Sequence, residues 1–154
     1  MALLKIREQN RDLTKESFDI CEGMLKDLEK GKRPALEAIK CALDNSFYNA
    51  SVGYLTPGKK RVTTELNVSS VQKMARVVFM LEILLRNVDT GGVNTKRELY
   101  YLAKGFMKST TLYKPLEFSD QVESDAVIDF ICDMLQAYRE ELNCFANDRG
   151  GQTY

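Results

Sequence analysis

The side chains of this chain that are best suited to catalysis are an arginine and a tyrosine four residues apart. They lie in the segment Asn94-Thr95-Lys96-Arg97-Glu98-Leu99-Tyr100-Tyr101. On a helix, four residues at i, i+4, i+7 and i+11 share one exposed, largely basic stripe: Arg97, Tyr101, Lys104 and Lys108. Tyrosine can act as a covalent nucleophile, and a neighbouring cation can stabilise charge on a transferring phosphoryl group. The stripe therefore suits attack on a phosphodiester.

The same segment predicts the helix that would carry these side chains. Thr95 and Glu98 have the spacing of a capping box, which marks a helix start. Apolar residues then recur at helical spacing and predict the buried face: Leu99, Leu102, Ala103 and Phe106. The alternative interpretation is that Tyr100 and Tyr101 form only a surface or half-buried aromatic pair.

The composition indicates one soluble globular domain with little acid–base chemistry available. The chain has 154 residues, of which 44% are hydrophobic and 29% charged, and it contains no histidine. Its four cysteines lack the close spacing of a metal site, so we expect reduced, mostly buried thiols and no metal ligands. No apolar run is long enough to cross a membrane, and the N-terminus becomes charged too early for a signal peptide. We therefore expect an intracellular protein, cytoplasmic or nucleoid-associated, or nuclear in a eukaryote.

The zero net charge conceals an uneven distribution along the sequence. Residues 34–114 carry 12 basic and 6 acidic side chains, whereas residues 115–154 carry 2 basic and 9 acidic. A basic middle segment predicts a polyanion-binding surface. An uneven distribution without such a role is the alternative.

Periodicity and turn residues predict a mainly helical chain with one small hairpin. The expected helices cover residues 14–30, 34–45, 67–87, 95–108 and 122–147, with the most apolar of them, 67–87, at the centre. The first helix would bury Phe18, Cys21, Leu25 and Leu28. Segments 51–55 and 61–66 are expected to pair around Pro57-Gly58, with Lys59, Lys60 and Arg61 at the tip, either as phosphate contacts or as a solvated loop. The class is α+β, of winged-helix type with a helix-turn-helix unit.

Several motifs, in order, resemble one family over roughly residues 34–154. Asn94–Tyr101 is similar to the active-site motif of the topoisomerase VI A subunit, a motif shared with the related meiotic double-strand-break transesterases. Further similar strings are Asn67-Val68, the acidic segment 118–125, Arg139–Leu142 and Asp148–Gly150. The resemblance implies a CAP-like winged helix in residues 34–154, preceded by a helical extension, residues 1–33, that would meet an ATPase B subunit.

The resemblance also assigns the chemistry. The second tyrosine of the pair, Tyr101, would attack DNA and form a 5′-phosphotyrosyl link, with Arg97 supporting the reaction. The expected phosphate contacts on double-stranded DNA are Lys96, Lys104, Lys108, Lys59, Lys60 and Arg61. The chain would thus be part of an ATP-dependent type II topoisomerase.

One departure from the family limits this expectation. The family continues into a Toprim domain that holds magnesium, and no such acidic arrangement occurs in this sequence. Magnesium would then come from a separate Toprim half and ATP use from a B subunit, within a homodimer or a complex with a Toprim-containing A subunit. The alternatives are a DNA-binding winged-helix module without chemistry and a regulatory module of such a complex.

Overall fold

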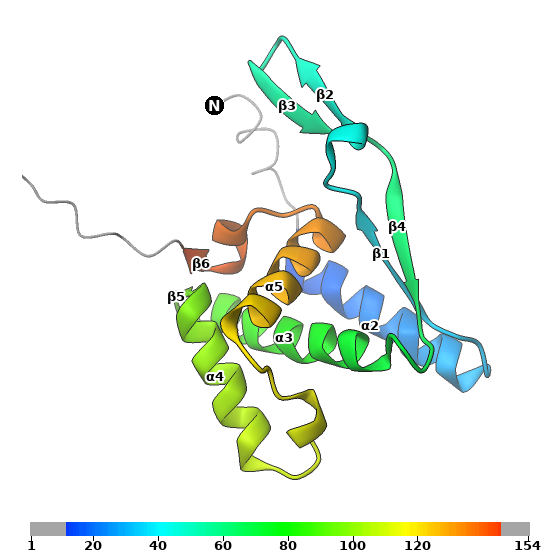
Figure 1. Ribbon diagram of the computed structural model, residues 1–154, viewed down its shortest axis with the longest axis vertical. Coiled ribbons are helices and arrows are strands. Elements are labelled where there is room, and N and C mark those ends of the chain that lie inside the picture. The colour runs from blue at the N-terminus through cyan, green and yellow to red at the C-terminus, as the bar shows by residue number, and fades with distance from the viewer. Residues whose placement is uncertain (1–11, 146–154) are drawn as a thin grey trace, which may run out of the picture.

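Helix α3 (Val71–Thr90) lies at the centre of the molecule and contacts three other helices (Figure 1). The structure is a computed structural model that describes residues 12–145. The helices around α3 are α2 (Leu13–Glu29), α4 (Lys96–Ser109) and α5 (Gln121–Leu135). The strands among residues 12–145 are β1 (Ala35–Ile39), β2 (Ser46–Asn49), β3 (Tyr54–Pro57), β4 (Arg61–Glu65), β5 (Asn94–Thr95) and β6 (Cys144–Phe145). Three short 3₁₀ turns complete the described elements: η1 (Leu43–Asn45), η2 (Lys114–Leu116) and η3 (Arg139–Leu142).

The α+β, mainly helical class is confirmed, with helices α3 and α4 joined by a short turn and a small strand ribbon whose first strand, β1, packs against α5. The core forms where α3, α4 and α5 meet, and its most buried side chains include Met80, Leu84, Leu99, Ile128 and Ile131. Gly91 ends α3 with a φ of 69°, a conformation that glycine adopts without steric cost. None of the helices among residues 12–145 has the length and apolarity to span a bilayer.

The expected helix over residues 34–45 is wrong. Residues 35–39 instead form strand β1, which pairs antiparallel with β4 from Ala35 opposite Glu65 to Ile39 opposite Arg61. Leu36 and Ala38 are buried while Ala35 and Glu37 are exposed, which is the two-residue alternation of a strand. Because the apolar residues also fit a helical period, only the pairing with β4 and the packing against α5 decide the outcome.

The expected hairpin around Pro57-Gly58 is also wrong in its pairing. β3 pairs with β2, and β4 pairs with β1, so the turn of the ribbon lies at residues 50–53. Gly53 adopts a φ of 76° there. Residues 58–60 connect the two ladders, and Lys59, Lys60 and Arg61 therefore lie at this junction instead of at a hairpin tip (Figure 1).

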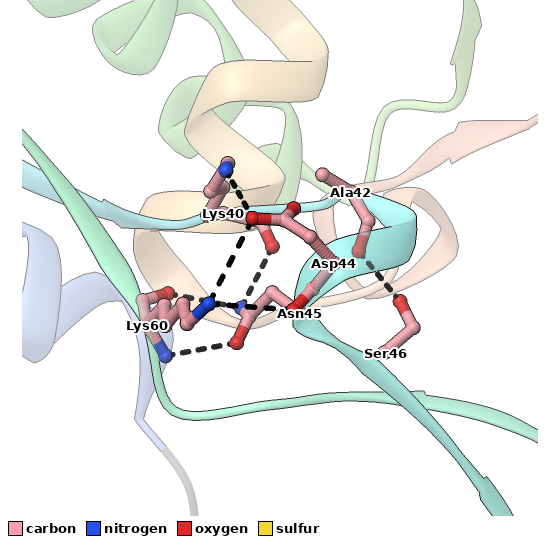
Figure 2. Close-up of polar contacts among 6 residues, drawn as sticks. All are labelled: Lys40, Ala42, Asp44, Asn45, Ser46 and Lys60. Carbon is pink, nitrogen blue, oxygen red and sulfur yellow. Dashed lines mark hydrogen bonds and ion pairs between the residues drawn. The ribbon is translucent and has the colours of Figure 1, made fainter.

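Asn45 holds the junction together (Figure 2). Its side-chain amide donates to the backbone carbonyls of Lys40 at 2.8 Å and Lys60 at 3.1 Å, and its oxygen accepts from the Lys60 backbone N–H at 3.1 Å. The backbone N–H of Gly58 donates to the Asn45 carbonyl. Asn45 is only 6% exposed, so these bonds are largely shielded from water.

We expect Asn45→Ala to lower the free energy of unfolding by about 1–3 kcal/mol, because it leaves partly buried backbone groups without partners. Chemical denaturation monitored by circular dichroism would measure the change. Asn49→Ala is the matched control, since the Asn49 side chain accepts one bond on the same ribbon, from the Ser51 N–H at 3.0 Å. Equal losses in the two variants would contradict a special role for Asn45.

The last expected helix, residues 122–147, is too long. Helix α5 ends at Leu135, and Gln136 follows with a φ of 51°. The chain then turns through η3 into β6, which pairs in parallel with β5 (Asn94 with Cys144, Thr95 with Phe145). The apolar residues Ile128, Ile131, Leu135 and Leu142 are buried, whereas Tyr138 and Phe145 are 46% and 40% exposed. The expected positions 146–147 of this helix and the family-like string at 148–150 lie outside the described residues.

Helix α2 is confirmed over nearly the predicted range, but of its four predicted buried residues only Cys21 packs against the core. Phe18, Leu25 and Leu28 are 65%, 61% and 50% exposed. The side that packs against α3 and α5 is instead formed by Leu13, Ser17, Ile20, Cys21 and Met24. The polar Ser17 is tolerated there because its hydroxyl donates to the Leu13 carbonyl at 2.7 Å.

Candidate active site on helix α4

Helix α4 begins where the capping residues predict it. The Glu98 backbone N–H donates to the Thr95 hydroxyl at 3.2 Å, and the Thr95 backbone N–H donates to the Glu98 carboxylate at 2.7 Å. These two bonds form a complete capping box. The helix start, and with it the angular position of every later side chain, is therefore set locally.

We expect Thr95→Ala to reduce the free energy of unfolding by about 1 kcal/mol, since it removes the N-cap acceptor of α4. Thermal or urea denaturation would measure it. Thr111→Ala, at an exposed threonine in the turn after α4, serves as the control and is expected to change little. An unchanged stability of Thr95→Ala would mean that tertiary packing alone fixes this helix end.

The two neighbouring tyrosines occupy different environments. Tyr100 is 8% exposed and belongs to the core, whereas Tyr101 is 56% exposed. Their ring centroids lie 5.2 Å apart, with the planes tilted by 52°. Of the two side chains, only that of Tyr101 is largely open to solvent.

Arg97 lies beside Tyr101, as its spacing predicts. The guanidinium carbon is 5.8 Å from the centroid of the Tyr101 ring, within cation–π range. Both side chains are exposed. The contact in this structure is with the ring face, so the guanidinium keeps its donors for another group, such as a phosphate oxygen.

An open hollow of about 640 Å³ lies next to Tyr101 on the outer side of α4. Leu102 and Phe106 line this hollow, although both were predicted for the buried face of α4. Their side chains are 41% and 55% exposed. The buried face of α4 instead consists of Leu99, Tyr100, Ala103 and Met107. The remaining lining residues are Asn94, Glu98, Gly105 and Ser109. The face is rotated toward Tyr100 because α3 and α5 pack on that side.

The three lysines of α4 that were predicted to contact DNA bond to different side chains. Lys96 bonds to the Asp129 carboxylate of α5 at 2.6 Å, and its side chain is only 19% exposed. Lys108 lies 3.7 Å from Glu117. Lys104 bonds to the Tyr100 hydroxyl at 2.9 Å, and this bond raises the pKa of the Lys104 ammonium. Acidic residues from beyond position 114 therefore partly neutralise the basic middle segment.

Lys59, Lys60 and Arg61 are not brought next to Tyr101. They lie at the ribbon junction, well apart from α4 in Figure 1. The Lys60 ammonium is 3.8 Å from the Asp44 carboxylate, and the Arg61 guanidinium is 4.0 Å from that of Glu37. Lys59 and Arg61 line a separate hollow of about 560 Å³. The six basic residues thus fall on two separate parts of the molecule.

The sequence interpretation missed two contacts near the site. One is the bond between Tyr100 and Lys104, which the i, i+4 spacing could have suggested. The other is Arg76, which donates to the carbonyls of Leu116 at 2.9 Å and Glu117 at 2.7 Å and thereby fixes the loop after α4. No local pattern could have predicted it, because its partners lie about 40 residues further along the chain.

The cysteines and acidic residues do not form a second chemical centre within residues 12–145. All four cysteines are free there, and no group of three or more metal-ligating side chains could hold a metal ion. Cys41 is exposed, contrary to the expectation of mostly buried thiols, and its bond to Asp133 raises its pKa to about 11. Burial raises the pKa of Cys132 to about 12. These thiols are therefore protonated, and weak nucleophiles, at neutral pH.

Residues 72–144, which include the whole of α4, match the family model described as type IIB DNA topoisomerase. Over these residues the chain is similar to this family of DNA topoisomerases. More particularly, its relatives are the A subunits of topoisomerase VI, which the motif around Tyr101 resembles.

Three of these A subunits of type 2 DNA topoisomerase 6 illustrate the similarity. The protein of Methanocaldococcus jannaschii is 27% identical over 146 residues, which cover 94% of this chain and 38% of the relative. That of Pyrococcus abyssi is 28% identical, covering 88% and 35%. That of Aeropyrum pernix is 28% identical, covering 82% and 34%. The chain thus spans little more than a third of the relatives' length. No solved structure matches it.

Proposed function

We propose that this chain is the DNA-binding and DNA-cleaving component of a type IIB topoisomerase, with Tyr101 as the nucleophile. The observation that carries the proposal is the pairing of an exposed Tyr101 with Arg97 on a capped helix, inside the region that matches the family. A core tyrosine could not reach a DNA backbone, and the neighbouring Tyr100 is such a residue.

The proposed reaction is a transesterification. The Tyr101 hydroxyl oxygen bonds to a backbone phosphorus while the bond from that phosphorus to the 3′-oxygen breaks. The phenol proton passes to water or another base, and the released 3′-oxygen takes up a proton, so the step consumes no cofactor. The product is a 5′-phosphotyrosyl link, and the reverse reaction rejoins the strand. Arg97 would neutralise the charge that develops on the phosphoryl oxygens.

Magnesium is not assigned to this chain, because the described residues offer no group of side chains to hold it. We propose that a separate Toprim half supplies the metal and that ATP acts only through a B subunit. The expected assembly is a homodimer or a complex with a Toprim-containing A subunit, bound to double-stranded DNA. The exposed face of α2 that carries Phe18, Leu25 and Leu28 would be available for the B subunit.

A covalent-trapping assay tests the proposal. The 154-residue chain would be mixed with end-labelled duplex DNA and magnesium, in the presence or absence of Toprim-containing A and ATPase B subunits, then stopped with denaturant. We expect a protein–DNA adduct that requires the Toprim partner. Absence of an adduct with every partner combination would overturn the assignment as a transesterase.

A non-catalytic DNA-binding module is the second candidate. It is favoured by the placement of basic residues at two separate sites, on α4 and at the ribbon junction, since phosphate contacts alone need no nucleophile. Salt-dependent DNA binding without any adduct would support it.

A further inference from the structure

Three lysines project from α4, and their partners give them different electrostatic roles. The ammonium groups of Lys96 and Lys108 each face a carboxylate, that of Asp129 at 2.6 Å and that of Glu117 at 3.7 Å. A carboxylate within salt-bridge distance offsets most of the field of an ammonium group. These two lysines therefore contribute less to the attraction of a DNA phosphate than their number suggests.

Lys104 is held by an uncharged partner. Its ammonium donates to the Tyr100 hydroxyl at 2.9 Å and lies 5.2 Å from the centroid of the same ring. A neutral phenol occupies one of the three ammonium donors and leaves the positive charge and the other donors available. Tyr100 itself is fixed by burial, at 8% exposure, so it can anchor the flexible lysine side chain.

The anchored ammonium lies near the proposed nucleophile. Lys104 is three residues after Tyr101, on the neighbouring turn of the helix, and helical side chains lean toward the N-terminus. The rings of Tyr100 and Tyr101 are 5.2 Å apart. Arg97 approaches Tyr101 from the preceding turn, 5.8 Å from its ring. Arg97, one turn before Tyr101, and Lys104, one turn after it, thus both lie along the tyrosine pair.

Building on the proposed function, we propose that Tyr100 is a positioning residue that anchors the Lys104 ammonium as a phosphate-binding group beside Tyr101. Lys104 is then the main phosphate-contacting lysine of α4, and Tyr100 is neither a spare nucleophile nor only a core ring. Anchoring helps because a lysine that is already ordered loses less conformational freedom when it binds phosphate. Glu117 also faces Lys104 and contributes to its high pKa, but less than the Tyr100 hydroxyl.

The anchor is tested on the free chain by NMR titration of the Lys104 side chain, assigned by comparison with Lys104→Met. Tyr100→Phe keeps the ring in the core and removes only the hydroxyl. We expect the pKa of Lys104 to fall in this variant, because its largest stabilising interaction is lost. An identical Lys104 titration in the wild-type chain and the variant would overturn the anchor.

The phosphate role is tested by fluorescence anisotropy with a labelled DNA duplex over a range of salt concentrations. Lys104→Met should weaken binding and reduce the slope of log K against log salt by about one, the change expected for one lost phosphate contact. Tyr100→Phe should weaken binding several-fold with the slope retained, because the charge remains but is no longer held. Lys108→Met, the matched control on the same helix, should change both quantities less. Equal effects of Lys104→Met and Lys108→Met would overturn the inference.

Failure of the inference and failure of the proposed function give different results. If the complex forms a Tyr101-dependent adduct while Lys104→Met binds and reacts like Lys108→Met, the function stands and the inference is overturned. If the wild-type chain neither binds duplex DNA nor forms an adduct, both are overturned. Since Lys104→Met leaves Tyr100 in the core, this variant remains informative even if Tyr100→Phe is poorly folded.

Discussion

Replacing Tyr101 with phenylalanine is expected to abolish the covalent protein–DNA adduct while leaving DNA affinity nearly unchanged. The substitution removes only the hydroxyl oxygen that would bond to phosphorus, and without it the proposed transesterification cannot occur. The side chain is 56% exposed, so loss of the hydroxyl is expected to cost little stability. Trapping with denaturant would measure the adduct, and anisotropy would measure the binding.

Two further tyrosine variants make this result specific. Tyr48→Phe is the matched control, since Tyr48 is 65% exposed but lies on β2, and it should leave the adduct yield unchanged. Tyr100→Phe should lower the yield without abolishing it, because Tyr100 is buried and would act only through Lys104. Complete loss in Tyr100→Phe with a full yield in Tyr101→Phe would mean that the nucleophile has been assigned to the wrong tyrosine.

Arg97→Gln is expected to slow adduct formation by roughly 10²–10³-fold, the range seen when one preorganised electrostatic contact to a transition state is removed. The guanidinium lies 5.8 Å from the Tyr101 ring, close enough to reach a phosphate that this tyrosine attacks. Arg97→Lys should recover part of the rate, because it keeps the charge but loses the paired donors of the guanidinium. Single-turnover trapping at saturating DNA would separate this loss from weaker binding.

Arg86→Gln provides the control for charge removal. Arg86 is an exposed arginine on α3 that bonds to Glu82 four residues earlier, at 2.6 Å. Its removal changes the net charge by the same amount as Arg97→Gln but should leave the rate of adduct formation close to wild type. A similar slowing in both variants would show that Arg97 acts only through general electrostatic attraction.

Local sequence determined the part of the candidate site that depends on one helix. The Thr95 and Glu98 side chains bond to backbone groups only three residues away, so the start of α4 could be predicted without knowing the fold. Once that start is fixed, the helical period places Arg97 beside Tyr101. The central helix and the general α+β class could be predicted for the same reason, because long apolar patterns and Gly91 act over short ranges of sequence.

Contacts between segments that are distant in the sequence decided the strand pairings. Residues 35–39 fit a helix or a strand, and pairing with residues 61–65 selected the strand. Residues 46–49 pair with residues 54–57, and Asn45 bonds to Lys60 across the junction between the two strand pairs.

The burial of Tyr100 was likewise set by packing, since the predicted buried face of α4 did not include it, whereas the exposure of Tyr101 on one stripe with Arg97 followed from the helical spacing. The sequence by itself determined which residues could react and on which helix they lie. The tertiary structure alone decided that Tyr100 is buried in the core and that carboxylates offset the charges of Lys96 and Lys108, because these contacts involve partners from other elements.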